Sequence, residues 1–365
     1  MSDLRTLLGV GEDHPLYRYR IPVGLLVLVV GLRPVVAHEW FAGYGQLATS
    51  MLIWMVFVAS FNLLFGYTGL LSFGHAMFLG IGMYVVAIGV SVFALPWLVA
   101  AVAGVLVAGT VGYAIGRIIA GKGEIYFAML TLAFAQAAYF VVNADPYGLT
   151  GGSSGLTQGT LPTWIETYRG QKRVVLAGMQ GEWYWLVALV FLVTMLALWQ
   201  VVRSPFGRTL MAVRDNRQLA KSIGIDTDRY QTAAFTLSTM FAAVAGALME
   251  INSQGASLET FAINTSGDTV LMAVLGGVNY FFGPITGVFV WLFAEDYLTS
   301  FETLHLPLAE FSTVSVDLSG LLNYWAFALG ALFVLVVLVS PKDGIWGFVR
   351  GLTERVAARL REVTR

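Results

Sequence analysis

Long apolar runs separated by short polar connections are the dominant pattern of this chain. A membrane-spanning helix needs about 20 mainly apolar residues, with roughly 17–25 allowed. Runs close to this length predict spanning helices at 21–36, 46–65, 69–94, 97–117, 124–142, 183–202, 230–250 and 321–340. So many runs predict an all-α fold, that of a polytopic membrane protein.

The apolar stretch 268–298 is too long for one span. Its centre is interrupted by residues that weaken or break helices, namely Gly276, Gly277, Gly283 and Pro284. We therefore expect two short segments, 268–280 and 283–298, folded back on each other at the Gly-Pro break. The total is then about ten transmembrane or half-membrane helices, with both termini on the same side of the membrane.

Basic residues predict which side faces the cytoplasm. Cytoplasmic loops are enriched in Lys and Arg, and most of the 21 Lys and Arg of this chain lie in 1–20, 117–123, 203–229 and 341–365. We expect a cytoplasmic N-terminus, 1–20, a transmembrane domain, 21–340, and a basic cytoplasmic tail, 341–365. Within the domain, 143–182 is expected to be an external loop and 203–229 a cytoplasmic one. A topology with two more or two fewer spans would give the same excess of Lys and Arg in the cytoplasmic loops.

The composition agrees with a membrane protein and argues against several other classes. The chain is 57% hydrophobic and 12% charged, whereas soluble domains carry about 25% charged residues. It has no cysteine and four dispersed histidines, which excludes thiolate sites and disfavours a histidine metal site. We expect no catalytic residue, no metal site and no nucleic-acid partner. The first 20 residues do not resemble a cleavable signal peptide, since they mix both charge signs.

Residues 116–123, GRIIAGKG, come close to a phosphate-binding P-loop. The motif requires a magnesium-binding Ser or Thr where this chain has Gly123, and it follows a buried strand rather than a membrane helix. We interpret the segment as a tight cytoplasmic turn. If ATP drives this protein, another chain binds it.

The loop 203–229 contains clear helix signals. Ser204 followed by Pro205 is typical of a helix start, and Gly224 supplies a matching stop. A mainly helical loop of this kind either lies on the membrane interface or binds a partner, and these residues alone favour neither reading.

Several segments resemble a known family. Gln218-Leu219-Ala220, followed after three residues by Gly224, resembles the coupling loop of ABC-importer permeases. The longer motifs resemble the M-type membrane permease subunit of branched-chain amino acid ABC importers, in the order expected of it: FNLLFGYTGLLSFGHAMFLGIGMY (61–84), GEIYFAMLTLAFAQ (123–136), LTGGSSGL (149–156), SPFGRTLMAVRDNRQLAKSIGID (204–226), VLGGVNYFFGPITG (274–287) and SPKDGIWG (340–347).

The resemblance implies a multi-pass permease of the plasma (inner) membrane that forms half of a translocation pathway. Its implied partners are a homologous second permease subunit, two cytoplasmic ATP-binding subunits and an extracytoplasmic substrate-binding protein. ATP and Mg would be bound by the ATPase subunits, so this chain itself needs no cofactor. Branched-chain or other neutral amino acids are the expected substrates, with urea or short amides as the alternative. An ion-coupled secondary transporter and a membrane-embedded enzyme are the competing classes.

Two sets of site residues follow from these expectations. Polar residues in or beside the Gly-rich segments are candidates for the translocation pathway, although each of them is also explained by helix packing: Asn62, Ser72, His75, Thr131, Gln136 and Asn279. The resemblance implies ATPase coupling for residues of the loop 203–229: Gly207, Arg208, Leu210, Val213, Arg214, Arg217, Gln218, Leu219, Ala220 and Gly224. Within that set we expect Leu210, Val213, Leu219 and Ala220 to be buried by the ATPase subunit, with Arg214 and Arg217 at the rim.

Overall fold

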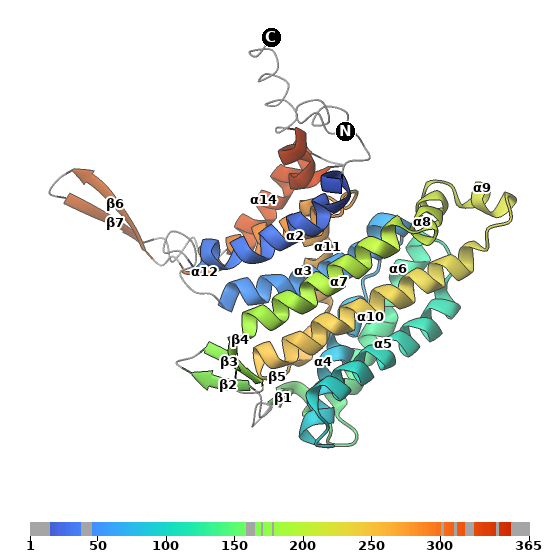
Figure 1. Ribbon diagram of the computed structural model, residues 1–365, viewed down its shortest axis with the longest axis horizontal. Coiled ribbons are helices and arrows are strands. Elements are labelled where there is room, and N and C mark those ends of the chain that lie inside the picture. The colour runs from blue at the N-terminus through green and yellow to red at the C-terminus, as the bar shows by residue number, and fades with distance from the viewer. Residues whose placement is uncertain are drawn as a thin grey trace, which may run out of the picture. The chain divides into compact units, whose positions relative to one another are not determined.

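The computed structural model describes residues 15–37, 46–157, 165–168, 171–176, 179–300, 303–309, 312–317, 325–340 and 343–351 (Figure 1). The expected N-terminal segment up to residue 14 and the tail beyond residue 351 lie outside these residues. The chain divides into two compact units, Thr49–Ala273 and a second unit that joins Met1–Ala48 to Val274–Arg365.

The unit Thr49–Ala273 is built from helices joined by short connections. Its long helices are α3 (Gln46–Thr68), α4 (Ala76–Ser91), α5 (Trp97–Ile119), α6 (Glu124–Ala144), α7 (Trp183–Arg203) and α10 (Thr227–Ser253). Helix α10 packs against both α4 and α5. Glycines make this close approach possible: a Cβ on Gly82 would lie 2.7 Å from the Cα of Ala243, and one on Gly112 would lie 3.0 Å from the Cβ of Thr239. Small residues at helix crossings are the usual solution inside a bilayer.

The second unit contains α2 (Pro15–Val36), α12 (Gly283–Ser300), α14 (Trp325–Val339) and a helical segment at 344–351. Helix α11 (Ile263–Gly276) begins in the first unit and ends in the second. The predicted break at the Gly-Pro sequence is therefore present, because α11 ends at Gly276 and α12 begins at Gly283. Helix α14 and the segment 344–351 meet at a bend of 51°.

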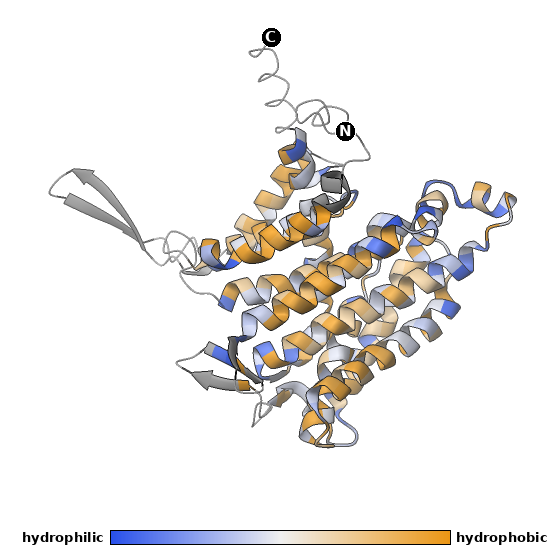
Figure 2. Cartoon of the chain, viewed as in Figure 1, coloured by the Kyte–Doolittle hydropathy of each residue, from blue (hydrophilic) through white to orange (hydrophobic). Residues whose placement is uncertain are grey.

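Five described helices are long and apolar enough to cross a membrane by themselves: α3, α5, α6, α7 and α10. A sixth span results if α14 and 344–351 count as one bent helix, and the shorter apolar helices are Ile21–Val36 and Ala76–Ser91. Helix α5 exposes apolar side chains, among them Leu98, Val102 and Leu106. Its ribbon is coloured largely as hydrophobic (Figure 2). A chain with several such helices is a multi-pass, mainly α-helical membrane protein.

The predicted span 69–94 is shorter than expected. Helix α4 begins only at Ala76, and residues 69–75 form a turn-containing segment without regular helix. The reason is local: Gly69 has φ +74, a left-handed conformation that ends α3 and that residues with a Cβ adopt only at a cost.

Small β-structures in the connections add to the expected all-α fold. β1 (Leu156–Thr157) pairs antiparallel with β5 (Gly255–Ala256), and β2 (Ile165–Tyr168), β3 (Gln171–Leu176) and β4 (Met179–Glu182) form an antiparallel sheet. β6 (Thr303–Ala309) and β7 (Ser312–Asp317) form a hairpin. The 3-10 helices η1 (Gly152–Ser154) and η2 (Leu258–Phe261) complete these connections.

Candidate functional site

The loop 203–229 forms two short helices, α8 (Pro205–Asp215) and α9 (Arg217–Ser222). The predicted start is confirmed, since Ser204 Oγ accepts a hydrogen bond of 3.3 Å from the amide of Gly207 and Pro205 follows as the first helical residue. A second cap divides the helix: Asn216 Oδ1 accepts from the amide of Leu219 at 2.9 Å. The loop therefore forms two short helices separated by Asn216 rather than one continuous helix.

Two glycines shape this element for different reasons. Gly224 follows α9 with φ +88, and no atom lies within 4 Å of the position of its absent Cβ. Glycine is therefore favoured at this position only by the positive φ of the backbone and not by a lack of space. A Cβ on Gly207, in contrast, would overlap the backbone carbonyls of Val201 and Val202 at the end of α7. Gly207 allows α8 to lie directly against α7.

Burial within the loop differs from the expectation for a docking surface. Leu210, Val213 and Ala220 are buried inside this chain, with at most 3% of each exposed. The reason is that α8 packs against α7 and α10, and α9 packs against α8 and α10. Leu219 and Ile223 are 60% and 70% exposed. Only Leu219 of the four expected apolar contacts is therefore free to meet another protein, and Ile223 joins it.

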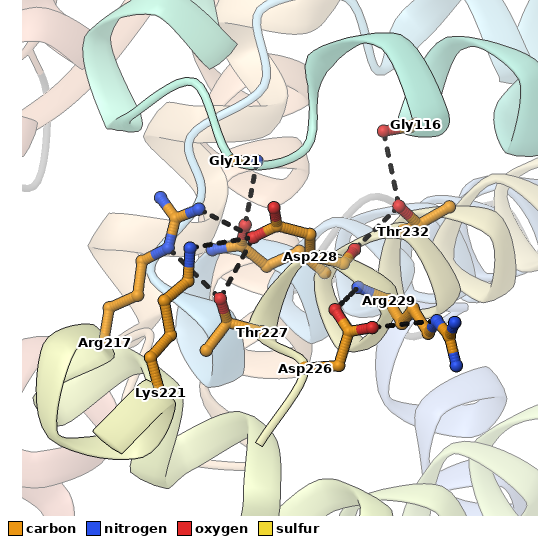
Figure 3. Close-up of polar contacts among 10 residues, drawn as sticks. Gly116, Gly121, Arg217, Lys221, Asp226, Thr227, Asp228, Arg229 and Thr232 are labelled. Atoms are coloured by element: carbon orange, nitrogen blue, oxygen red, sulfur yellow. Dashed lines mark hydrogen bonds and ion pairs between the residues drawn. The ribbon is translucent and has the colours of Figure 1, made fainter. Parts of the chain in front are cut away.

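Arg217 also has a partner inside the chain (Figure 3). Its Nη2 lies 2.9 Å from Oδ1 of Asp228 in the first turn of α10, and Lys221 Nζ lies 3.5 Å from the same oxygen. Thr227 Oγ1 donates to this carboxylate at 3.0 Å. Arg217 thus fastens α9 to the start of α10 and does not form a free rim.

The segment 116–123 lies against the same end of α10. The amide of Gly121 donates to Oε1 of Gln231 at 3.4 Å, and Thr232 Oγ1 lies 3.4 Å from the carbonyl oxygen of Gly116 (Figure 3). Helix α5 leads into this turn, so the fold around the GRIIAGKG sequence differs from the strand–loop–helix of a phosphate-binding P-loop.

Arg214, the second expected rim residue, is exposed but also contacts its own chain. Its Nη1 donates a hydrogen bond to the backbone carbonyl of Gly66 in the last turn of α3. Both expected rim arginines therefore connect the loop to the helices of its own unit.

The candidate pathway residues fall into two groups by burial. Asn62, Ser72, His75 and Thr131 are buried, each with 2% or less exposed. Gln136 is exposed on α6, and Asn279 is exposed in the turn between α11 and α12. The first four belong to the unit Thr49–Ala273 and Asn279 belongs to the other unit. Asn279 lies in the break between α11 and α12.

His75 is held between α3 and α4. Its Nε2 lies 3.0 Å from Ser60 Oγ, and that hydroxyl donates its single proton to the carbonyl of Phe57 at 2.6 Å. Nε2 must therefore carry the ring proton and donate it to Ser60. The imidazole stacks on Phe57 at a centroid distance of 5.4 Å, and Phe61 and Phe78 surround it.

Three buried polar atoms near this junction have no hydrogen-bond partner among the described residues: Asn62 Oδ1, Ser72 Oγ and His75 Nδ1. Buried polar groups are nearly always hydrogen-bonded, so such atoms fit either water or substrate as a partner. Thr131, in contrast, donates to the carbonyl of Ala128 at 2.9 Å, and a Cβ on Gly74 would lie 2.7 Å from its carbonyl carbon. The backbone of Thr131 thus packs on the segment 69–75, which favours a packing role.

Two of the family-like motifs meet in the second unit. The hydroxyl of Tyr280, from 274–287, donates to Asp343 Oδ1, from 340–347, at 2.9 Å. Phe282 stacks on Trp346 with a centroid distance of 5.1 Å. No sequence signal marks these side chains as a site. Their contact could not be predicted from local sequence patterns, because the two segments are far apart in the chain.

A third polar cluster lies at the opposite end of α10. Lys172 Nζ, from β3, donates to the carbonyls of Ile251 and Asn252, the latter at 2.5 Å. Burial lowers the pKa of Lys172 to about 8, although the charge of Glu250 opposes the shift. The cation thereby caps the C-terminal end of α10, where unpaired carbonyls attract positive charge.

Nearby, Asp145 organises the turn that follows α6. Its Oδ1 accepts from the amides of Leu149 and Thr150 at 2.7 and 2.9 Å, and its Oδ2 accepts from Gly151 at 3.0 Å. The hydrogen bond from the amide of Thr150 is the largest of the effects that hold the pKa of this carboxyl below its usual range.

Comparison with known proteins identifies the family of this chain. The family described as the branched-chain amino acid transport system permease component matches residues 43–339. The chain belongs to this family. The resemblance found in the motifs is thereby confirmed, and the family is a membrane component of transporters.

Individual relatives include permease proteins of branched-chain amino acid transport systems. The high-affinity branched-chain amino acid transport system permease protein LivM of Escherichia coli (strain K12) is 26% identical over 337 residues, 88% of this chain and 73% of the relative. A probable LivM of Methanocaldococcus jannaschii is 25% identical over 287 residues, 70% of this chain and 83% of the relative. The autoinducer 2 import system permease protein LsrC of Photorhabdus laumondii is 29% identical over 180 residues, 39% of this chain and 52% of the relative. No solved structure matches.

Proposed function

We propose that this chain is the permease subunit of an ATP-binding-cassette importer of the plasma membrane, and that it forms half of the pathway for branched-chain or other neutral amino acids. The observation that carries the proposal is the capped helix pair α8–α9. It exposes Leu219 and Ile223 while Arg214 and Arg217 connect it to two different helices of its unit. An element that is exposed on one side and fixed to helices on the other suits the transfer of movement from a partner.

The proposed partners follow from this role. A homologous second permease would complete the pathway, two cytoplasmic ATPase subunits would bind ATP and Mg, and an extracytoplasmic protein would deliver the substrate. Leu219 and Ile223 would enter the ATPase surface as apolar anchors, and the exposed Gln218 and Arg208 would contact the same subunit. Such anchors commonly dominate the free energy of an interface.

The choice of a neutral substrate rests on the charge inside the helices. Glu250 is the one fully buried charged side chain among the described helices, and Trp97 and Lys172 interact with it. No other charged side chain among the described residues is fully buried. The names of the LivM relatives add support for branched-chain amino acids.

The test is assembly followed by transport. The chain is co-expressed with the permease, ATPase and binding-protein genes that neighbour its own gene, purified as a complex and reconstituted into proteoliposomes. We expect uptake of radiolabelled leucine, isoleucine or valine that requires internal ATP; urea serves as the competing substrate. Uptake by the isolated chain in an ion gradient would instead identify a secondary transporter.

A matched pair of substitutions tests the docking surface. Ile223→Ala removes an exposed isoleucine of the loop, and Ile118→Ala removes one that is 58% exposed at the end of α5. We expect Ile223→Ala to weaken ATPase association at least about fivefold, since anchor truncation costs about 1 kcal/mol or more. Ile118→Ala should leave association unchanged. Equal association in both variants would contradict the docking surface.

A further inference from the structure

The C-terminal end of α3 leaves a carbonyl available for a distant partner. The amide of Gly69 donates to the carbonyl of Phe65 at 3.1 Å, and that of Leu70 donates to the carbonyl of Leu64 at 3.4 Å. The carbonyl of Gly66, the next residue after Phe65, accepts from the side chain of Arg214 instead. Carbonyls in the last turn of a helix carry partial negative charge and attract cations.

Arg214 lies closely along this helix end. A Cβ on Gly69 would be 3.1 Å from Arg214 Cγ, so the absence of a side chain there gives the arginine its path. The phenol of Tyr67 is within electrostatic range of the same guanidinium. Arg214 thus caps α3 although 148 positions separate it from Gly66.

The segment that follows α3 carries two of the polar residues considered for the pathway. Ser72 and His75 lie in 69–75, and His75 turns back to α3 through Ser60. The next amide, that of Ala76, donates to Ser266 Oγ in α11 at 3.2 Å. The segment is therefore in contact with several helices, and a displacement of the end of α3 must displace it too.

Arg217 has a different destination from Arg214. It holds α9 to Asp228 at the start of α10, whereas Arg214 holds α8 to the end of α3. The two arginines are three residues apart in the chain, yet they fasten the loop to two separate helices. Only the Arg214 contact leads directly to 69–75.

We propose that Arg214 is a positioning residue that transmits movement of the loop 203–229 to the segment 69–75 by capping α3. The inference rests on the proposed function, because the movement is supplied by the ATPase subunits. When the loop is displaced, the guanidinium pulls on the Gly66 carbonyl and shifts the segment that holds Ser72 and His75. Opening of the pathway is thereby coupled to the state of the ATPases.

The experiment compares three variants in the reconstituted complex: Arg214→Gln, Arg214→Lys and the control Arg229→Gln. Arg229 is an exposed arginine of the same region whose partner is Asp226, three residues away at 2.8 Å. Arg229→Gln therefore makes the same change of charge without touching α3. Each variant is assayed for ATPase association, for ATP hydrolysis and for uptake per ATP hydrolysed.

We expect Arg214→Gln to assemble and hydrolyse ATP, with uptake per ATP reduced roughly tenfold, within the usual range of coupling between sites. Arg214→Lys should recover part of this ratio, because its ammonium keeps the charge but lacks the planar fork of donors. Arg229→Gln should keep the wild-type ratio. A general loss of folded protein would lower hydrolysis and uptake together and would leave their ratio unchanged.

The outcomes separate the inference from the function on which it rests. A wild-type ratio in an assembled Arg214→Gln complex overturns the inference alone. If Arg214→Gln fails to fold, Arg214→Lys decides: a reduced ratio supports transmission, and a wild-type ratio shows a structural role only and overturns it. If the wild-type complex shows no ATP-dependent uptake, the proposed function fails, and the inference fails with it.

Discussion

The hydroxyl of Tyr280 donates a hydrogen bond of 2.9 Å to Asp343 Oδ1 and joins two segments that are 63 residues apart. Beside this contact the backbones approach very closely, since a Cβ on Gly344 would lie 2.7 Å from the Cα of Gly277. Gly344 and Gly277 both have positive φ, +56 and +107. The turn between α11 and α12 and the turn after α14 therefore form one packed unit that only glycine permits.

The first prediction concerns this junction. Gly344→Ala should lower the free energy of unfolding by about 2–4 kcal/mol, because it adds left-handed strain and overpacking. Gly351→Ala is the matched control, since its Cβ would meet no atom within 4 Å and its φ is unexceptional. Thermal unfolding in detergent measures both. Equal melting temperatures for the two variants would show that the junction tolerates a methyl group.

The second prediction concerns Gly224. Because no atom lies near its absent Cβ, the cost of substitution is set by backbone conformation alone, about 1–2 kcal/mol for a residue with a Cβ. Asn adopts left-handed conformations more readily than β-branched residues do. Gly224→Asn should therefore preserve more uptake per ATP than Gly224→Val, while both variants insert and fold. Identical uptake in the two would point to a cause other than backbone strain.

Features governed by neighbouring residues were predictable from the sequence. Ser204, Pro205 and Gly224 act on the few residues around them, and the structure has a helix start and a positive φ at these positions. The break at Asn216 was missed, although Asn is a strong N-cap and its signal was present in the sequence. The non-helical segment 69–75 does not follow from the apolar pattern, since apolar residues occur throughout the predicted span 69–94.

Features governed by distant contacts were not predictable in this way. Leu210 and Val213 were expected to be buried, but the sequence could not show whether they meet their own chain or another. The partner of Arg214 lies 148 residues away, and the pairing of β1 with β5 joins residues about a hundred positions apart. Such contacts depend on the packing of whole helices, which no local pattern records.

The third prediction distinguishes packing from transport at His75. Ser60→Ala removes the acceptor of the buried Nε2–H and should cost about 1–3 kcal/mol, because the donor is left without a partner. Adding His75→Phe replaces both polar partners by apolar groups, so stability should largely return. Uptake should return with it if His75 only packs α3 against α4. Restored stability with absent uptake would instead assign His75 to the pathway.

The fourth prediction tests the contact between α9 and α10. Arg217→Asp places two like charges together and should weaken ATPase association, because the orientation of the exposed Leu219 and Ile223 is lost. The charge swap, Arg217→Asp with Asp228→Arg, should recover part of the loss. Since both side chains are partly exposed, at 28% and 48%, the pair itself contributes only about 0.2–1 kcal/mol. Failure of the swap to restore association would show that Arg217 acts on the partner directly.

The last prediction uses the pH dependence of Lys172. Its pKa is lowered to about 8, whereas in the unfolded chain the ordinary value of 10.5 applies. Between these two values the unfolded state binds a proton that the folded state has released. Stability contributed by this group must therefore rise with pH from about 8 to about 10.5, and it must be constant below pH 8.

Two variants isolate this contribution. Lys172→Met has no titratable group, and Lys172→Arg keeps its charge throughout the range because arginine does not deprotonate in proteins. Both should lack the rise that the wild type shows when melting temperatures are measured between pH 7 and pH 10. Lys172→Arg should remain the more stable of the two at pH 7, since its guanidinium can still donate to the carbonyls of Ile251 and Asn252 at the end of α10. Parallel profiles for wild type and both variants would mean that Lys172 titrates in the folded protein as it does in the unfolded chain, and that the β3 contact leaves this lysine fully solvated.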